Sequence, residues 1–231
     1  MKNLFILLAM ICINTEAIKA QQTKKRNVGT YDGIHIAGSY KVTLISRAEG
    51  TIELKGDEED LEKIASNVKN GTLTIKQKEK SWFRTWDTEM VYITIPVEDI
   101  DKIILSGSGE IDSRFTLEGD HFKTIVSGSG NINISVDVNH LDAMVTGSGE
   151  IILEGDASTV DFTLTGSGEI EASGVEASTG KAKITGSGDI DMHASEILDA
   201  FITGSGDVVC KGNPKKQKTK ITGSGDISVR D

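Results

Sequence analysis

Seven copies of the tripeptide Gly-Ser-Gly are each followed by an acidic residue or an asparagine, and these side chains have the types and spacing that chemistry could use. They are Glu110, Asn131, Glu150, Glu169, Asp189, Asp207 and Asp226. If the copies stack in register about 4.8 Å apart, five consecutive carboxylates line one outer edge, from Glu150 to Asp226. Neighbouring carboxylates would then repel by about 0.9 kcal/mol in water, and Ca²⁺ prefers ligands of this all-oxygen kind. The column is consistent with calcium sites at Glu150, Glu169, Asp189, Asp207 and Asp226, or with a solvated acidic face.

A second outer column adds polar groups to the same face. It contains Asp112, Asn133, Glu171 and Asp191. Paired carboxylates on a β-helix can perform acid/base or lyase chemistry, so a polysaccharide lyase or hydrolase is one alternative. Here the carboxylates recur as a regular ladder and not as one singular cluster beside a basic residue. We therefore expect a protein that is not an enzyme and has no catalytic residues.

An aromatic segment is the second candidate site. Trp82, Phe83, Arg84 and Trp86 lie close together in the segment from Lys78 to Glu89. Such a cluster could stack on a sugar or anchor a protein partner, or it could pack against the end of the fold. The sequence leaves both interpretations open.

The histidines and cysteines give weaker signals. His121 and His140 both lie seven residues before a motif glycine, which would place them on adjacent turns of a coil. Two histidines without a third ligand are more typical of a surface pair than of a metal site. Cys210 falls in a mostly apolar column and is expected to be an inert core residue. Apart from the calcium hypothesis, no cofactor is expected.

The spacing of the motif predicts the elements that carry these residues. Its first glycines recur every 18 to 21 residues, a period typical of solenoids. An aliphatic residue stands two positions before each of them and another stands four positions after, as expected for strand, turn, strand. The motif glycines, which we expect at the turns, are Gly107, Gly109, Gly128, Gly130, Gly147, Gly149, Gly166, Gly168, Gly186, Gly188, Gly204, Gly206, Gly223 and Gly225.

The predicted fold is all-β: a parallel β-helix, or β-solenoid, with about seven rungs of 18–21 residues. One period is long enough for a closed rung of three short strands. We assign residues 101–231 to this repeat and residues 27–100 to a β-rich N-terminal cap and first coils. Within the cap, the spacing of Leu61, Ile64, Ala65 and Val68 predicts one short helix between Asp57 and Val68. The last strand, near Ile227, has no obvious cap, which allows a homo-oligomer through that edge.

The N-terminus has the pattern of an export signal. A ten-residue apolar run, residues 4–13, is too short to span a bilayer, and a cut after Ala20 would make residues 1–20 a signal peptide. Lipid attachment at Cys12 is an alternative. We expect an exported chain, in the periplasm or at the outer surface, with no transmembrane segment after processing. The net charge of −10 argues against a nucleic-acid partner.

Taken together, these motifs resemble a known family. The repeated Gly-Ser-Gly-[Glu/Asp]-Ile units, with the segments Ile34–Val42 and Gly71–Ile75 before them, resemble the DUF2807 domain, the putative auto-transporter adhesin head GIN domain, which is common in exported proteins of Bacteroidetes. The resemblance implies a right-handed β-helix in the cell envelope, with no established activity. It favours a non-enzymatic, adhesin-like module that binds a glycan or an envelope protein, and a structural envelope protein is a further alternative.

Overall fold

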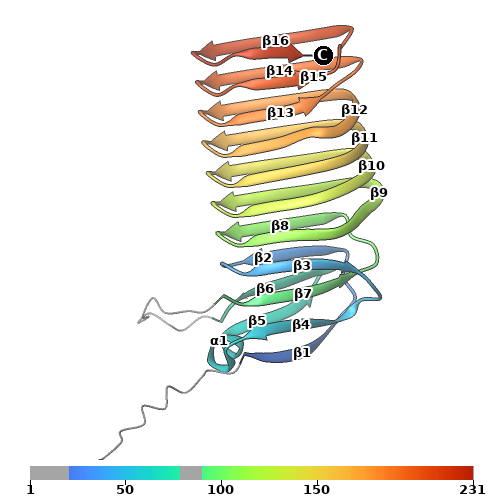
Figure 1. Cartoon of the computed structure of the whole chain (residues 1–231), viewed down its shortest axis with the longest axis vertical. Coiled ribbons are helices and arrows are strands. Elements are labelled where there is room, and N and C mark those ends of the chain that lie inside the picture. The colour runs from blue at the N-terminus through green and yellow to red at the C-terminus, as the bar shows by residue number, and fades with distance from the viewer. Residues whose placement is uncertain (1–20, 79–89, 231) are drawn as a thin grey trace, which may run out of the picture.

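The computed structural model describes residues 21–78 and 90–230. Its strands wind into a right-handed parallel β-helix that stands on a β-rich cap (Figure 1), which confirms the predicted fold class. The proposed signal peptide, residues 1–20, lies outside the described residues.

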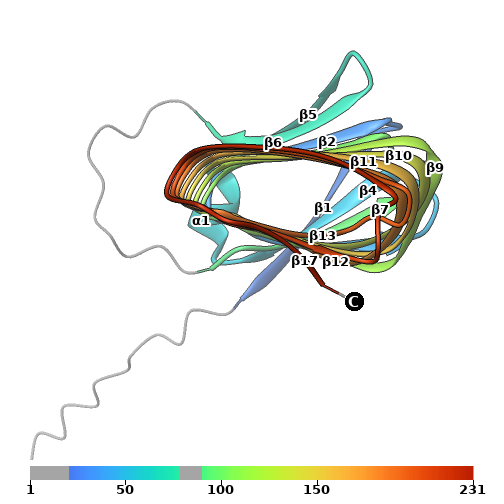
Figure 2. The same ribbon diagram turned by 90° about the horizontal axis from the view of Figure 1, so that it is seen from above.

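The repeat region forms the upper coils. Each coil runs along one flat side, turns at a Gly-Ser-Gly motif, and returns along the other side (Figure 2). Its strands are β8 (Lys102–Gly107), β9 (Glu110–Gly128), β10 (Asn131–Gly147), β11 (Glu150–Gly166), β12 (Glu169–Gly186), β13 (Asp189–His193), β14 (Ile197–Gly204), β15 (Val208–Lys211), β16 (Lys216–Gly223) and β17 (Ile227–Arg230).

The rungs differ from the predicted three short strands. Strands β9 to β12 continue around the edge opposite the Gly-Ser-Gly turns, which gives flattened coils with two long sides. The unequal repeat lengths are absorbed on the stretch leading to that opposite edge, where the register shifts between Asn133 and Ser135 and again between Ile152 and Glu154. The Gly-Ser-Gly edge therefore stays in register although the period varies.

The first coils do not stack in chain order. Strands β2 (Gly33–Ala37) and β3 (Lys41–Ser46) form a coil that pairs on one side with β6 (Thr72–Gln77) and β7 (Tyr92–Val97), and on the other with β8 and β9. The earliest coil thus lies between two later ones (Figure 1).

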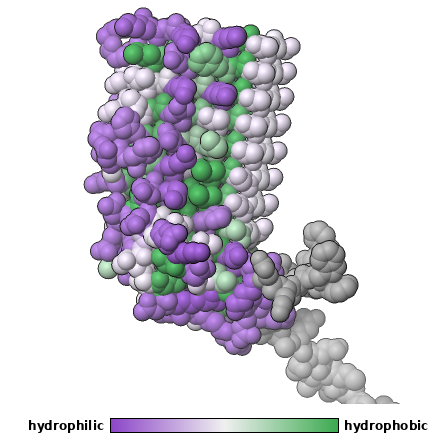
Figure 3. Space-filling view, turned by 180° about the vertical axis from the view of Figure 1, so that it is seen from behind, coloured by the Kyte–Doolittle hydropathy of each residue, from purple (hydrophilic) through white to green (hydrophobic). Residues whose placement is uncertain are grey.

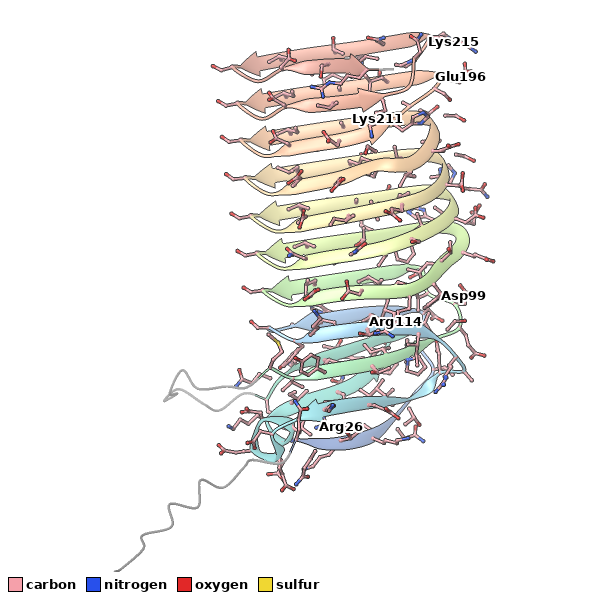
Figure 4. All side chains as sticks on the ribbon, in the orientation of Figure 1. Arg26, Asp99, Arg114, Glu196, Lys211 and Lys215 are labelled. Atoms are coloured by element: carbon pink, nitrogen blue, oxygen red, sulfur yellow. The ribbon has the colours of Figure 1, made fainter. Side chains whose placement is uncertain are left out.

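A cap covers the lower end. It is built from β1 (Gln22–Gly29), β4 (Gly50–Gly56), α1 (Glu58–Glu62) and β5 (Ile64–Lys69). Arg26 links β1 to the helix and to β5, because its guanidinium donates hydrogen bonds to the carbonyl oxygens of Leu61 at 2.6 Å and Ile64 at 2.8 Å (Figure 4). Leu61 is fully buried, so the cap closes this end of the apolar core.

The predicted helix is shorter than its spacing indicated. It ends at Glu62, with Lys63 as its C-cap, and residues Ile64–Lys69 form β5, which pairs antiparallel with β6. The turn at Asn70 and Gly71, both with positive φ, closes this hairpin. The pairing supplies hydrogen-bond partners to the N–H and C=O groups of β5 that face β6.

Two aliphatic columns fill the coil. The residues two positions before each motif glycine are at most 2% exposed from Leu105 to Ile202, and those four positions after it are fully buried from Ile111 to Val208. The alternation along each strand therefore fixes which residues remain outside.

Candidate binding faces

Along the Gly-Ser-Gly edge, the turns of successive coils stack in register. From the second motif onward, the serine N–H donates to the carbonyl oxygen of the first glycine one coil below, as Ser129 does to Gly107 at 3.0 Å. Gly128 has φ +125°, and a Cβ on Gly130 would stand 2.7 Å from the carbonyl oxygen of Gly109. The first glycine is needed for its backbone angle and the second for the close approach of the coils.

The acidic residues after the turns lie on one side of the coil, which we call the acidic face. Cα partners in adjacent rungs are Asn131 and Glu150, Glu150 and Glu169, and Glu169 and Asp189. The column begins with a cation, because Lys41 pairs with Glu110 at 2.9 Å. The structure thus brings the predicted carboxylates together in one column.

The last three carboxylates are linked through the backbone. Oδ1 of Asp189 accepts from the N–H of Asp207 at 2.8 Å, and Oδ1 of Asp207 accepts from the N–H of Asp226 at the same distance. These contacts offset part of the repulsion along the column.

Glu169 lies among four other carboxylates on this face. Partial burial raises the pKa of its carboxyl group above the ordinary value, and Glu150, Asp191, Glu171 and Asp189 raise it further. In the described part of the chain, no group of three or more His, Cys, Asp or Glu side chains is placed to hold a metal ion. Calcium binding by this column stays a prediction.

The opposite side of the coil, which we call the striped face, has a different chemistry (Figure 3). Ile104, Ile125 and Met144 are Cα partners in consecutive rungs, point outward and are half-buried. We call these three residues the apolar stripe. Two positions further along each strand lies a column of hydroxyl groups: Ser106, Ser127, Thr146, Thr165, Thr185, Thr203 and Thr222.

Sequence reasoning missed the apolar stripe because it followed the inward columns. The signal was present three residues before each motif glycine, where three aliphatic or methionine side chains come in succession although alternation points them outward. Further along, the same column contains Phe201, whose ring lies 5.4 Å from the Nζ of Lys218.

The predicted aromatic site, Trp82, Phe83, Arg84 and Trp86, lies outside the described residues. Beside that segment, Met90 is 51% exposed and Tyr92 is 44% exposed. Tyr92 is the Cα partner of Lys41, in line with the acidic column.

The remaining candidates are placed as a surface pair and a core residue. His121 and His140 are Cα partners with ring centroids 6.2 Å apart, and Nε2 of His121 lies 3.2 Å from Oδ2 of Asp142. Cys210 is fully buried, and this burial raises the pKa of its thiol, so it is poorly suited to nucleophilic chemistry.

Comparison with known families decides the chain's relationship. The model of the family DUF2807, described as putative auto-transporter adhesin, head GIN domain, matches residues 30–214. The chain belongs to this family. The DUF2807 match spans strands β2 to β15, which include most of the coil and all of the cap except β1. No curated protein matches the sequence.

Solved structures share the DUF2807 fold seen here. A putative adhesin from Bacteroides fragilis is 24% identical with a TM-score of 0.85, and the alignment covers 92% of this chain and 98% of that one. A putative lipid binding protein from Parabacteroides distasonis is 25% identical with a TM-score of 0.74, over 91% and 97% of the two chains. A putative adhesin from Parabacteroides merdae is 22% identical with a TM-score of 0.73, over 91% and 96%.

Among residues 21–78 and 90–230, none of the helices combines the length and hydropathy needed to cross a bilayer.

Proposed function

We propose that this protein is an exported, non-enzymatic binding module of the cell envelope, and that it adheres to a glycan or a protein through the striped face. The observation that carries the proposal is the apolar stripe with the hydroxyl column beside it. The family description and the adhesin neighbours support a binding role.

The striped face suits a glycan in particular. A pyranose ring has an apolar face of C–H groups and a rim of hydroxyl groups. On this protein Ile125 and Met144 could contact the C–H face, while Ser127 and Thr146, on the same outward side of their strands, could exchange hydrogen bonds with the rim. Repetition at the rung spacing of about 4.8 Å would suit a polymer more than a single sugar.

The test is a glycan array read with the purified protein. We expect Ile125→Asp and Met144→Asp to weaken retention by tenfold or more, since each places a charge on the contact surface. Ile152→Asp is the matched control, because Ile152 is also half-buried and outward but lies on the acidic face. Equal retention of all three variants would remove the striped face from the proposal.

The aromatic segment is tested separately. Trp82→Ala and Trp86→Ala reduce retention if these side chains add to the glycan contact. If both variants bind as the wild type does, the segment has no part in sugar binding. If no glycan is retained, a protein ligand is the remaining class, to be sought by cross-linking in the native envelope.

Export rests on the apolar run in residues 4–13 and on the neighbours from Bacteroides and Parabacteroides. N-terminal sequencing of the protein from fractionated cells tests it. A chain recovered with Met1 in the cytoplasmic fraction would contradict export.

The catalytic alternative makes its own prediction. A polysaccharide lyase or hydrolase would release unsaturated or reducing ends from an acidic polysaccharide, and the product would disappear in Glu169→Gln. A broad panel of substrates with no new ends would exclude it.

A further inference from the structure

The last rung, formed by β16 and β17, is bare on its core side. Ile221 of β16 and Val229 of β17 are at inward positions, yet they are 42% and 38% exposed. Their counterparts one rung below, Ile202 and Cys210, are 2% and 0% exposed. Among the residues that the structure describes, none covers these inward side chains at this end.

The backbone of this rung is also open. Within the described residues, β16 pairs with β14 and β17 with β15, each on one side alone. The other edge of both strands presents unsatisfied N–H and C=O groups, which can template further pairing. The opposite end of the molecule differs, because there Leu61 and Ile64 of the cap are buried.

A partner that closes this end must match two strands at once. β16 runs toward the Gly-Ser-Gly turn and β17 runs away from it, so one added peptide strand would cover half of the rung. A second copy of the same rung has the required width, the same two directions and the same inward residues, which are apolar at Ile221, Ile227 and Val229 and polar at Gln217 and Thr219. We propose that two copies of this chain pair end to end through their last rungs, as an isologous dimer.

Two arrangements keep the strands aligned. In both, the two-fold axis is perpendicular to the coil axis and the paired strands are antiparallel. If the axis crosses from one flat side to the other, β16 meets β16 of the second copy. If it runs along the strands, β16 meets β17 and the two Gly-Ser-Gly edges coincide.

Charge separates these arrangements. The outward residues of β16 include Lys216, Lys218 and Lys220, and Lys215 beside them pairs with Glu196 at 2.6 Å (Figure 4). A β16 to β16 contact would place these lysines side by side. A β16 to β17 contact places Lys220, near the turn, beside Asp226 of the other copy, also near the turn. At the far end it places Lys216 near Arg230 of the other copy, so it sets opposite charges against like ones where the β16 to β16 contact sets lysines against lysines. Like charges across an interface are costly, so the second arrangement follows.

The first measurement is the mass and length of the purified protein in solution. Light scattering during size exclusion should give twice the chain mass at concentrations up to about 1 mM, where even an interface with a Kd near 0.1 mM is populated. Small-angle scattering should show a maximum dimension close to twice that of one molecule. A monomer throughout this range, or a dimer no longer than one molecule, would overturn the proposal.

Substitutions on the last rung supply the second measurement. Ile221→Lys and Val229→Lys should each give a monomer. Thr163→Lys, an outward residue in the middle of the striped face, is the control and should leave the dimer intact. Circular dichroism melts identify any variant that has lost its fold.

A charge exchange distinguishes the two axes. Lys220→Glu and Asp226→Lys should each weaken dimerisation by about tenfold, and the double variant should restore it. If Lys220→Glu alone strengthens the dimer, the β16 to β16 arrangement holds and the stated one is wrong. Glycan binding by the Val229→Lys variant is measured separately. If this variant is monomeric and still binds the glycan, dimerisation and glycan binding are independent, so either proposal can fail without the other.

Discussion

Oδ1 of Asp189 accepts a hydrogen bond of 2.8 Å from the backbone N–H of Asp207, its neighbour one coil further on. The carboxylate of Asp189 repels that of Asp207, but its hydrogen bond also stabilises the backbone at Asp207. The acidic column is therefore partly a structural device.

This contact predicts different effects for two substitutions. Asp189→Ala removes the acceptor and should lower the free energy of unfolding by about 1 kcal/mol. Asp189→Asn keeps an oxygen at the same place and should cost less than half of that. Urea unfolding of the three proteins measures both. Equal losses would mean that charge, and not the hydrogen bond, is what the column uses.

At the second glycine of the motif, we expect that adding one methyl group lowers the free energy of unfolding strongly. Gly130→Ala would place a Cβ 2.7 Å from the carbonyl oxygen of Gly109, and forcing the coils apart should cost about 3 kcal/mol. Gly119→Ala is the matched control, since a Cβ there meets nothing within 4 Å. The midpoints of urea unfolding compare the two variants, and similar midpoints would contradict the close approach.

The raised pKa of Glu169 leads us to expect that the free energy of unfolding depends on pH. Because its pKa is raised in the folded state, the folded chain holds a proton more tightly than the unfolded chain, and its ionisation opposes folding as pH rises past the ordinary glutamate value of about 4.3. Glu169→Gln should therefore raise the melting temperature at about pH 7. The gain should fade toward about pH 4, where the wild-type carboxyl is increasingly protonated.

Glu176→Gln serves as the control for Glu169. It removes one charge from the edge opposite the turns, away from the four carboxylates that surround Glu169. A gain as large as that of Glu169→Gln, at the same pH, would assign the effect to net charge alone.

Calcium binding makes the fourth prediction. If the column from Glu150 to Asp226 binds Ca²⁺ with a Kd of about 1 mM, then 10 mM Ca²⁺ should add about 1.4 kcal/mol of stability. The melting temperature should then rise by roughly 3–5 °C. Glu150→Gln with Glu169→Gln should abolish this rise. An unchanged melting temperature in the wild type would leave the column a role in solubility and backbone contacts.

Much of the coil could be predicted because one constraint repeats. Gly107 and each later first glycine need the same backbone angle, so their spacing marks the turns, and alternation on either side assigns the inward columns. The register of Glu150, Glu169 and Asp189 follows from those turns. Periodicity is a property of the sequence itself, and no distant contact is needed to interpret it.

The parts that do not repeat could not be predicted in the same way. Ile64 and Val68 fit a helix as well as a strand, and only the hairpin with β6 decides between them. The place of β2 between two later coils depends on pairings with residues about 40 and 70 positions away, which no local pattern records. The exposure of Ile221 likewise depends on a rung that is not stacked above it among the described residues, since Ile221 and Ile202 both begin the same segment Ile-Thr-Gly-Ser-Gly-Asp.

The capped end and the bare end of the coil face opposite directions. The described chain begins at the capped end, and the bare rung lies at the far tip (Figure 1). A rod tethered to a membrane by its N-terminal side would hold that tip outward. If two chains pair tip to tip as proposed above, their N-terminal sides lie at opposite ends of the dimer, a geometry that suits two facing membranes and not one patch of membrane.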